Sequence, residues 1–318
     1  MKLQGKRIFM TGGAGFIGAT LCRRLAPKNK ITIYDNFHRD ALRFSDLAGH
    51  PNVTVVEGDI LDTKSLQKAA VGQQVIIHLA AIAGVSTVVN NPAATLKINM
   101  IGTYNVLEAI RIEDVERFVH FSTSEVYGPF VFRGAEDAMT TQGAVGEPRW
   151  VYGISKVAGE HLAYAYFKEM GLPSVSIRPF NVYGPQQVGE GAAHHFVVNA
   201  LKGRPLIVHN DGAQIRSWCY IDDLIEAVLA SLDKKAAVGH VFNIGNPQAT
   251  CTTLSLAQQA IRLTGSKSEI IFKRIQHPDV EVRVPGIDKA KKLLGYEPKV
   301  GLDEGLRRTI AWYRQFNH

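Results

Sequence analysis

The sequence predicts an α/β protein: a doubly wound parallel sheet with a smaller, interleaved C-terminal lobe. Short apolar runs alternate with stretches of helical periodicity, which is the pattern of a parallel sheet covered by helices on both faces. A glycine-rich turn joins the first apolar run to the first helical stretch, and polar residues end a later run. Ligands of such sheets bind at the carboxyl ends of the strands, so both features predict a site there.

The first strand, 7–10, runs into the glycine-rich turn 11–18, and a helical pattern follows from Phe16 to Leu25. Glycines in this place allow a tight turn, close backbone approach to a pyrophosphate and close helix–strand packing. A lone glycine-rich turn is more often only a loop, but this one lies between strand and helix, where a dinucleotide-binding turn belongs. We therefore expect dinucleotide contacts from Gly12, Gly15, Phe16, Ile17 and Gly18.

The next strand, 30–34, ends on Asp35, which follows Gly15 by 20 residues. A carboxylate there accepts hydrogen bonds from the adenosine ribose and repels a 2′-phosphate, so it favours NAD over NADP. Arg39 lies close by in the sequence and weakens this preference. A third strand, 53–56, leads to Asp59, which either meets the adenine or caps the helix that starts near Thr63.

Two further strand ends carry residues of interest. Small side chains end the fourth strand, 75–81, and leave room for a dinucleotide, although a well-packed strand end explains them nearly as well. A helical pattern covers 99–111, and the fifth strand, 117–121, ends in four polar residues, Ser122, Thr123, Ser124 and Glu125. Ser124 is the candidate partner of a substrate hydroxyl. Glu125 is a candidate acid or base, with a helix cap or salt-bridge partner as the structural alternative.

Tyr152 and Lys156 are four residues apart, so they lie one turn apart on the same face of a helix. An ammonium close to a phenol favours the phenolate and lowers a tyrosine pKa that starts near ~10. Such a tyrosine exchanges a proton with a sugar hydroxyl near neutral pH. The spacing alone is weak evidence, because most such pairs are solvated surface residues.

Bulk properties exclude several classes of protein. The 318 residues suffice for a large core, and no apolar run approaches the ~20 residues that span a bilayer. The chain enters its first strand without a secretory segment, so we expect a cytoplasmic protein with no membrane association. Three scattered cysteines and eleven histidines show no metal-ligand spacing, and we expect no metal. The +7 net charge is spread without a basic block, which favours a phosphorylated small molecule over nucleic acid.

Taken together, these motifs resemble the extended short-chain dehydrogenase/reductases, in particular the NAD-dependent nucleotide-sugar epimerases and dehydratases of the UDP-glucose 4-epimerase type. The resemblance covers nearly the whole length. It implies a Rossmann domain over 1–180, to which 218–245 returns, and a nucleotide-sugar lobe over 181–318. It depends on the order of the motifs 11–18, Asp35, 58–60, 78–81, 122–128, Tyr152 with Lys156, and 178–185.

The resemblance implies that NAD stays tightly bound while the sugar C4 is oxidised and Tyr152 takes the hydroxyl proton. Lys156 would hold the nicotinamide ribose and lower the Tyr152 pKa. A homodimer formed through segments 99–111 and 153–170 is usual for the family. The further cofactor contacts that it implies are Asn36, Asp59, Ile60, Leu79, Ala80, Ala81, Asn99 and Ser122.

In the substrate lobe the resemblance implies that Asn181, Arg216 and Arg283 contact a UDP- or dTDP-hexose. Arg216 follows an Asp-Gly turn, and a guanidinium suits bidentate phosphate binding. The family often has an Asn in this region that contacts the nucleotide diphosphate, whereas this chain has His194 and His195. His195 is therefore a candidate substrate contact. A histidine at the start of a helix is as often a surface residue without such a role.

Three reactions remain open at this stage, in addition to a non-catalytic NAD-binding protein, which the presence of both Tyr152 and Lys156 disfavours. A 4-epimerase needs little beyond Tyr152 and one hydroxyl, Thr123 or Ser124. A 4,6-dehydratase needs a base, for which Glu125 is available, and an acid where the chain has only Ser124. A sugar-acid decarboxylase shares the Thr-Ser-Glu run. We rank the 4-epimerase first by a small margin, then the dehydratase, then the decarboxylase.

Overall fold

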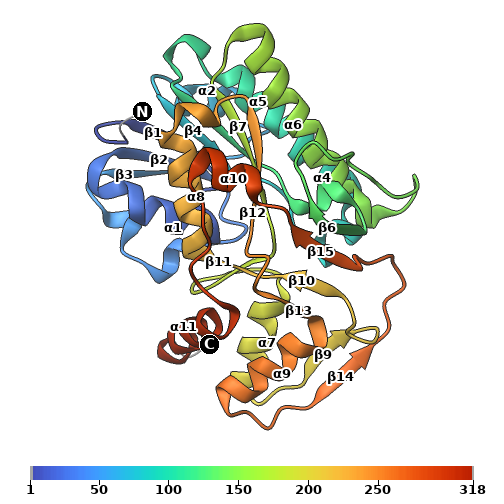
Figure 1. Ribbon diagram of the computed structural model, residues 1–318. Coiled ribbons are helices and arrows are strands. Elements are labelled where there is room, and N and C mark those ends of the chain that lie inside the picture. Colours follow the sequence, from blue (N-terminus) through green and yellow to red (C-terminus); the bar gives the residue numbers. More distant parts are fainter. Residues whose placement is uncertain (1–2, 317–318) are drawn as a thin grey trace.

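The computed structural model describes residues 3–316 and confirms the predicted parallel sheet (Figure 1). Its seven strands are all parallel and lie in the order β12-β7-β5-β4-β1-β2-β3. The order reverses between β1 and β4, which opens a crevice at their carboxyl ends. The strands are β1 (Arg7–Thr11), β2 (Lys30–Asp35), β3 (Val53–Glu57), β4 (Val75–His78), β5 (Arg117–Phe121), β7 (Ser174–Pro179) and β12 (His240–Ile244).

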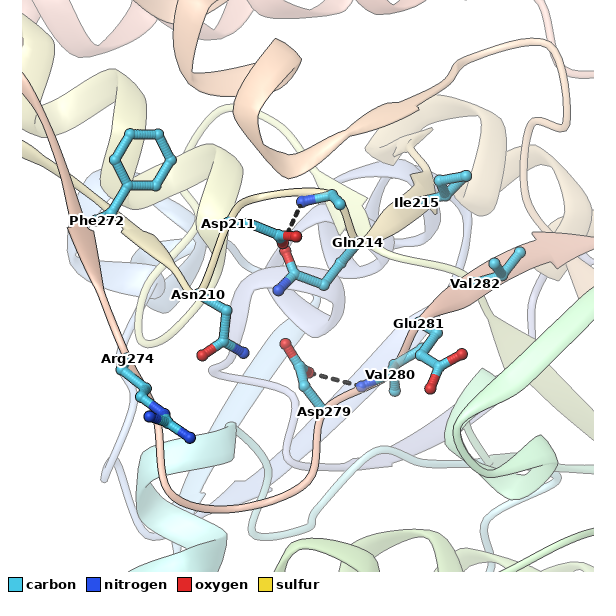
Figure 2. A pocket seen from close by; sticks show the side chains of 11 residues that line it. Asn210, Asp211, Gln214, Ile215, Phe272, Arg274, Asp279, Val280, Glu281 and Val282 are labelled. Carbon is cyan, nitrogen blue, oxygen red and sulfur yellow. Dashed lines mark hydrogen bonds between the residues drawn. The ribbon is translucent and has the colours of Figure 1, made fainter.

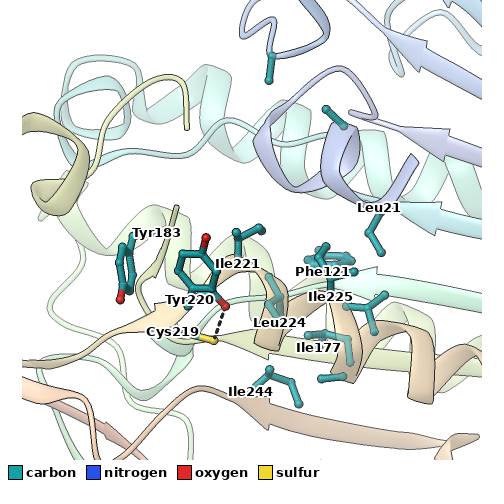
Figure 3. Close-up of a cluster of buried hydrophobic side chains, with 14 of the residues drawn as sticks. Leu21, Phe121, Ile177, Tyr183, Cys219, Tyr220, Ile221, Leu224, Ile225 and Ile244 are labelled. Atoms are coloured by element: carbon teal, nitrogen blue, oxygen red, sulfur yellow. Dashed lines mark hydrogen bonds between the residues drawn. The ribbon is translucent and has the colours of Figure 1, made fainter. Parts of the chain in front are cut away.

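Helices cover both faces of this sheet because the strands are apolar on both sides. In β1, Ile8 and Met10 pack into the core beneath α1 and α8, while Phe9 between them packs beneath α2, α5 and α6. Figure 3 shows Leu21 of α1 and Leu224 of α8 over the first of these faces. The helices are α1 (Phe16–Leu25), α8 (Ile221–Asp233) and α10 (Asp288–Leu294) on one side, with α2 (Thr63–Ala70), α5 (Gly102–Ala109) and α6 (Val151–Met170) on the other.

The remaining strands build a second lobe below the main sheet in Figure 1. A four-stranded sheet has the order β13-β10-β15-β6, and two strand pairs, β8 with β11 and β9 with β14, complete it. No helix within 3–316 is long and apolar enough to traverse a bilayer. The lobe consists of β6 (Phe130–Gly134), β8 (Val182–Tyr183), α7 (Ala192–Leu201), β9 (Leu206–His209), β10 (Ile215–Ser217), β11 (Cys219–Tyr220), β13 (Thr250–Thr252), α9 (Thr253–Thr264), β14 (Ile270–Lys273), β15 (Val282–Pro285) and α11 (Leu302–Gln315).

The chain crosses between the two lobes more often than the expected division at residue 180 implies. Strand β12 returns to the main sheet beside β7. Strand β6, which lies within 1–180, instead pairs with β15 of the substrate lobe. Helix α10, which lies within 181–318, packs against β12 and α8 of the main domain. Each lobe is therefore assembled from several separate stretches of chain.

The structure changes the bounds of two predicted elements. Strand β4 ends at His78, three residues earlier than expected. The helix predicted over 99–111 is present but starts earlier and ends at Ala109: α4 (Pro92–Leu96) continues through a π-helical turn, Lys97–Ile101, into α5. Helix α8 has no side-chain cap, and its Asp223 carboxylate accepts hydrogen bonds from the backbone of Lys299 and Val300.

Candidate active site

A pocket of about 640 Å³ lies at the carboxyl ends of the main-sheet strands. The segments that follow β1, β2, β3, β4 and β5 line it together with the start of α6. Every residue that the sequence suggested for the cofactor lines this pocket except Asn99. Their direct contact with a cofactor stays a prediction. These residues are Gly12, Gly15, Phe16, Ile17, Gly18, Asp35, Asn36, Asp59, Ile60, Leu79, Ala80, Ala81, Ser122, Tyr152 and Lys156.

The glycine-rich turn fits the pyrophosphate of a dinucleotide. Gly12 has φ +70°, and a Cβ on it would come within 2.5 Å of the Ala80 backbone nitrogen, so only glycine lets these two loops meet. Gly15 precedes α1, and no side chain caps that helix. The backbone N–H groups of its first turn are therefore available to an anion.

Asp35 and Asp59 line the pocket at the ends of β2 and β3. The Asp35 carboxylate accepts hydrogen bonds from the backbone of Ala14 (2.9 Å) and Phe37 (2.8 Å), which fixes its orientation. Burial raises the Asp35 pKa, although these hydrogen bonds oppose the effect. Asp62, and not Asp59, caps α2 by accepting from Ser65, so the helix-cap alternative for Asp59 is wrong.

Asn99 lies outside the described lining of the pocket, and its expected contact with the cofactor stays a prediction. Its amide oxygen accepts from the Ile82 backbone at 2.8 Å, and its nitrogen donates to the Ile82 carbonyl and to Ser155 Oγ, both at 3.0 Å. The π-helical turn directs this buried side chain inward. Asn99 is therefore a positioning residue that ties the loop after β4 to α6.

Tyr152 and Lys156 both face the pocket from α6, as their spacing predicts. Lys156 Nζ donates to the Phe121 carbonyl at 2.7 Å and lies 6.0 Å from the centre of the Tyr152 ring. Burial lowers the Lys156 pKa to about 8, against the opposing charge of Glu160. The ammonium is thus held on the end of β5.

The expected low pKa of Tyr152 is wrong for this structure. Burial raises the Tyr152 pKa to about 12, and the Glu125 carboxylate acts in the same direction. A hydrogen bond with Thr123 and the charges of Arg39 and Arg149 lower the Tyr152 pKa, but their effect is smaller than that of burial and Glu125. The phenol is therefore protonated at neutral pH unless further positive charge enters the pocket.

Glu125 is enclosed by arginines. Arg149 donates both terminal nitrogens to its carboxylate, one of them at 2.9 Å, and Arg283 lies 3.2 Å from it. Burial alone would raise the Glu125 pKa, but the charges of Arg149 and Arg283 hold it at about 2. The salt-bridge alternative is therefore what the structure shows, and a carboxylate with so low a pKa is a weak base.

The polar residues that follow β5 make different contacts. Thr123 hydrogen-bonds with Tyr152, so Thr123, and not Ser124, has the contact with the phenol. Ser122 donates to Glu160, which also forms a buried ion pair with Arg178 at 2.7 Å. Ser124 is buried and lies outside the described lining of the cofactor pocket.

The two predicted phosphate-binding arginines lie side by side in the substrate lobe. Arg216 on β10 is the register partner of Arg283 on the parallel strand β15. Arg216 Nη2 lies 3.4 Å from Asp279, and its charge reaches Glu125, whose pKa it helps to lower. This pair therefore connects the catalytic end of the site with the loop that carries Asp279.

Asp279 also lines a second, open pocket of about 1110 Å³ in the substrate lobe. Figure 2 shows it between the loop after β9, the end of β14 and the loop before β15. Polar and apolar side chains line it together, and the polar ones include Asn210, Asp211, Gln214 and Arg274.

Asn181 and the two histidines lie away from both pockets described above. The Asn181 amide donates to the Ser217 carbonyl at 2.9 Å and joins the loop after β7 to β10. His194 Nδ1 is 2.7 Å from the Tyr313 hydroxyl, so it connects α7 with α11. His195 is exposed. The structure thus gives the surface interpretation of His195 and a structural role to His194.

Arg149 was missed by the sequence analysis, although a signal for it exists. It lies three residues before Tyr152, and residues three apart share one face where a helix begins. The one-turn argument that links Tyr152 to Lys156 therefore also places Arg149 near Tyr152.

The sequence matches the model of the "NAD dependent epimerase/dehydratase family" over residues 8–245. The chain belongs to this family. It is therefore an NAD-dependent enzyme, and its extended short-chain dehydrogenase/reductase fold and its NAD cofactor are confirmed.

Individual family members divide among several activities. A UDP-N-acetyl-alpha-D-glucosaminuronate decarboxylase of Bacillus cytotoxicus is 34% identical over 98% of this chain and 99% of its own. The crystal structure of a UDP-glucuronic acid 4-epimerase of Bacillus cereus with UDP-glucuronic acid and NAD has a TM-score of 0.88 at 31% identity, over 98% and 99% of the two chains. A dTDP-glucose 4,6-dehydratase of Bacillus anthracis with NAD has a TM-score of 0.85 at 29% identity, over 98% and 97%.

Proposed function

We propose that this enzyme is a 4-epimerase of a UDP-sugar, foremost a UDP-hexuronate, that oxidises the sugar C4 hydroxyl to a 4-keto intermediate and reduces it again with NAD retained. The observation that carries the proposal is the enclosure of Glu125 by Arg149 and Arg283 beside Tyr152. An enzyme that eliminates water needs a base that accepts a carbon-bound proton near neutral pH. A carboxylate with a pKa of about 2 does not meet that need, and epimerisation does not require it.

The pocket at the ends of β1 to β5 would hold NAD, which supplies a hydride acceptor and then a hydride donor. Gly12 and the first turn of α1 suit its pyrophosphate, and Asp35 suits the adenosine ribose. Lys156, at the end of β5, would hold the ribose at the nicotinamide side.

Tyr152 would take the proton of the C4 hydroxyl and return it after the sugar ring has turned over. Thr123 would relay or orient that proton, because it already hydrogen-bonds with Tyr152. The raised Tyr152 pKa keeps the phenol protonated near neutral pH, so the phenolate that takes the C4 proton is disfavoured. The oxidation half therefore needs added positive charge beside the phenol, which the oxidised nicotinamide of NAD would supply when bound.

The substrate would extend from Tyr152 into the second lobe. Arg216 and Arg283 are adjacent across two strands and suit a diphosphate, since a guanidinium binds phosphate oxygens in pairs. Asp279 links Arg216 to the open pocket of Figure 2, so the nucleoside would lie on that side. A UDP-hexuronate is the leading sugar because several relatives bear the name of an enzyme of UDP-sugar acids.

Decarboxylation of the same 4-keto acid is the second candidate. The similarity to UDP-sugar-acid decarboxylases, together with the run Thr123-Ser124-Glu125, favours it. A carboxylate β to a ketone loses carbon dioxide as its electron pair moves into the carbonyl, so this reaction also needs no carboxylate base. Arginines near the sugar carboxylate would slow the loss of carbon dioxide, because they stabilise the carboxylate before it reacts.

Mass spectrometry of the products from UDP-glucuronate, UDP-glucose and dTDP-glucose tests the proposal. Epimerisation gives a new isomer of unchanged mass. Loss of carbon dioxide from UDP-glucuronate alone would establish the second candidate, and loss of water from a neutral sugar would contradict both. A purified protein that holds NAD but converts none of these sugars would contradict the substrate class.

We also propose that two copies associate through α5 and α6. These helices and the turn before α5 expose large apolar side chains, among them Ile101, Tyr104, Ile154 and Tyr164. Burial of such side chains against a second copy removes apolar area from water. Sedimentation of the native chain and of Tyr164→Glu tests this: a dimer that the variant converts to a monomer is the expected result.

A further inference from the structure

Arg39 crosses the mouth of the cofactor pocket and contacts two loops that are far apart in the sequence. Its Nη2 donates to the Ala83 carbonyl at 2.7 Å and lies 4.0 Å from Glu190 Oε1. Gly84 and Gly189 flank its guanidinium with φ values of +99° and +84°. A Cβ on Gly84 would come within 2.9 Å of Arg39 Nη2, and one on Gly189 within 2.7 Å of Arg39 Cζ.

Glu190 fastens the second loop to the first. Its Oε2 accepts from the Ser86 backbone at 2.8 Å, while Oε1 accepts from the Thr87 backbone at 2.9 Å and from Thr87 Oγ1 at 2.6 Å. Burial acts to raise the Glu190 pKa, but these hydrogen bonds and the charge of Arg39 hold it below its usual range. The carboxylate is therefore ionised at neutral pH, hydrogen-bonded to residues 86–87 and within ion-pair distance of Arg39.

The other end of the same loop is also anchored. Gln186 accepts a hydrogen bond from Arg23 at 2.7 Å, and the Gln187 carbonyl accepts one from Tyr313 at 2.8 Å. The segments that carry Arg39, Thr87 and Glu190 follow three different strands, β2, β4 and β8, and all three residues line the cofactor pocket. A dinucleotide that leaves across this mouth must therefore separate the loops.

We propose that Arg39 and Glu190 form a latch, fastened to residues 83–87, that closes the cofactor pocket and slows the release of NAD. Both side chains are partly exposed, at 29% and 26%, so they stand at the boundary between pocket and solvent. An enzyme that reduces and reoxidises the same cofactor in each turnover gains from slow release. The latch concerns the NAD cofactor of the family and does not depend on which sugar the enzyme converts.

The test compares NAD release from Glu190→Ala and Arg39→Met with release from Glu226→Gln. Glu226 forms an exposed ion pair with Arg24 at 2.6 Å, and neither residue lines the pocket, so this variant is a matched control. Protein loaded with radiolabelled NAD is diluted into excess unlabelled NAD, and retained label is followed with time. Each latch variant is expected to release NAD about tenfold faster, as for a lost charge-assisted hydrogen bond, and the control at the native rate.

Melting temperatures of the NAD-free proteins separate a lost latch from a damaged fold. Glu190→Gln serves as the milder variant, because it keeps an acceptor for the 86–87 backbone, and an intermediate release rate is expected. Native release rates in Arg39→Met and Glu190→Gln, with unchanged melting temperatures, would overturn the proposal. So would equal acceleration in the Glu226→Gln control.

Discussion

The cofactor pocket and the substrate lobe are built in contrasting ways. Most walls of the cofactor pocket are short runs that follow one strand, such as Gly12 to Gly18 after β1 or Ser122 after β5. The substrate lobe brings together residues that are distant in the sequence, as when Arg216 and Arg283 become neighbours through β10 and β15. The cofactor pocket can therefore be predicted from the order of motifs in the sequence. The substrate lobe depends on strand pairings that only the fold shows.

The same contrast extends to charge. At the cofactor end, the pKa of a buried group is set by its own surroundings. Lys156 donates to the Phe121 carbonyl, and burial lowers its pKa. At the substrate end, Arg149, Arg216 and Arg283 act together on Glu125. The boundary between the two regions is Tyr152, whose pKa responds to Thr123 on one side and Glu125 on the other.

Tyr152→Phe carries the largest expected effect and tests the cofactor end. Removal of the phenolic proton carrier should lower turnover by ~10² or more. Equilibrium binding of NAD and of the UDP-sugar should stay near native, because the ring remains in place. Turnover assays alongside calorimetric binding check both statements. A fully active variant would mean that another group carries the proton.

Arg216→Gln tests the substrate end. Loss of one guanidinium from a diphosphate site should raise the substrate KM by roughly 10- to 10²-fold, in line with a charged hydrogen bond of about 1.5–3 kcal/mol. The amount of bound NAD should not change, because Arg216 lies outside the cofactor pocket. A variant with native KM and reduced NAD content would reverse our assignment of the two regions.

Glu125→Gln tests the boundary between them. Removal of this carboxylate takes away a charge that raises the Tyr152 pKa, so the pH dependence of turnover should move to lower pH. The loss of turnover at the new optimum should stay below about tenfold for an epimerase. A variant that accumulates NADH and a keto sugar would instead assign Glu125 the role of a base.

The same variant should change acid stability. In the native chain the Glu125 pKa is about 2 in place of the ordinary 4.5, so its ionised form stabilises the fold above pH 4.5. This contribution is lost as the pH falls from 4.5 towards 2. Denaturant unfolding across that window should show a shallower loss of stability with acid in Glu125→Gln than in the native protein.

His195→Ala carries the smallest expected effect. The side chain is exposed and lines neither described pocket, so KM and turnover should stay within about twofold of native. A large rise in KM would restore the substrate contact that the sequence suggested and would extend the substrate site to α7.

The sequence predicts the strands and helices of the main domain well because each follows from a local pattern of apolar residues. It brings Asp35 to the pocket because the carboxyl ends of parallel strands meet, and it pairs Tyr152 with Lys156 because they are one helical turn apart. It gives no sign that Asn99 lies in a π-helical turn, because such a turn leaves no signal in apolar spacing. It also misjudges the Tyr152 pKa, because burial and the Glu125 charge depend on contacts between distant residues.

The crossing of β6 and β12 between the lobes limits how such an enzyme can be recombined. The substrate lobe has no single start and end in the chain, because β6 enters it from the main domain and α10 leaves it again. A new sugar preference therefore cannot be grafted as one cassette. The segments around β6, from β8 to β11, and from β13 to β15 would have to be exchanged together, or the preference altered by point substitution within them.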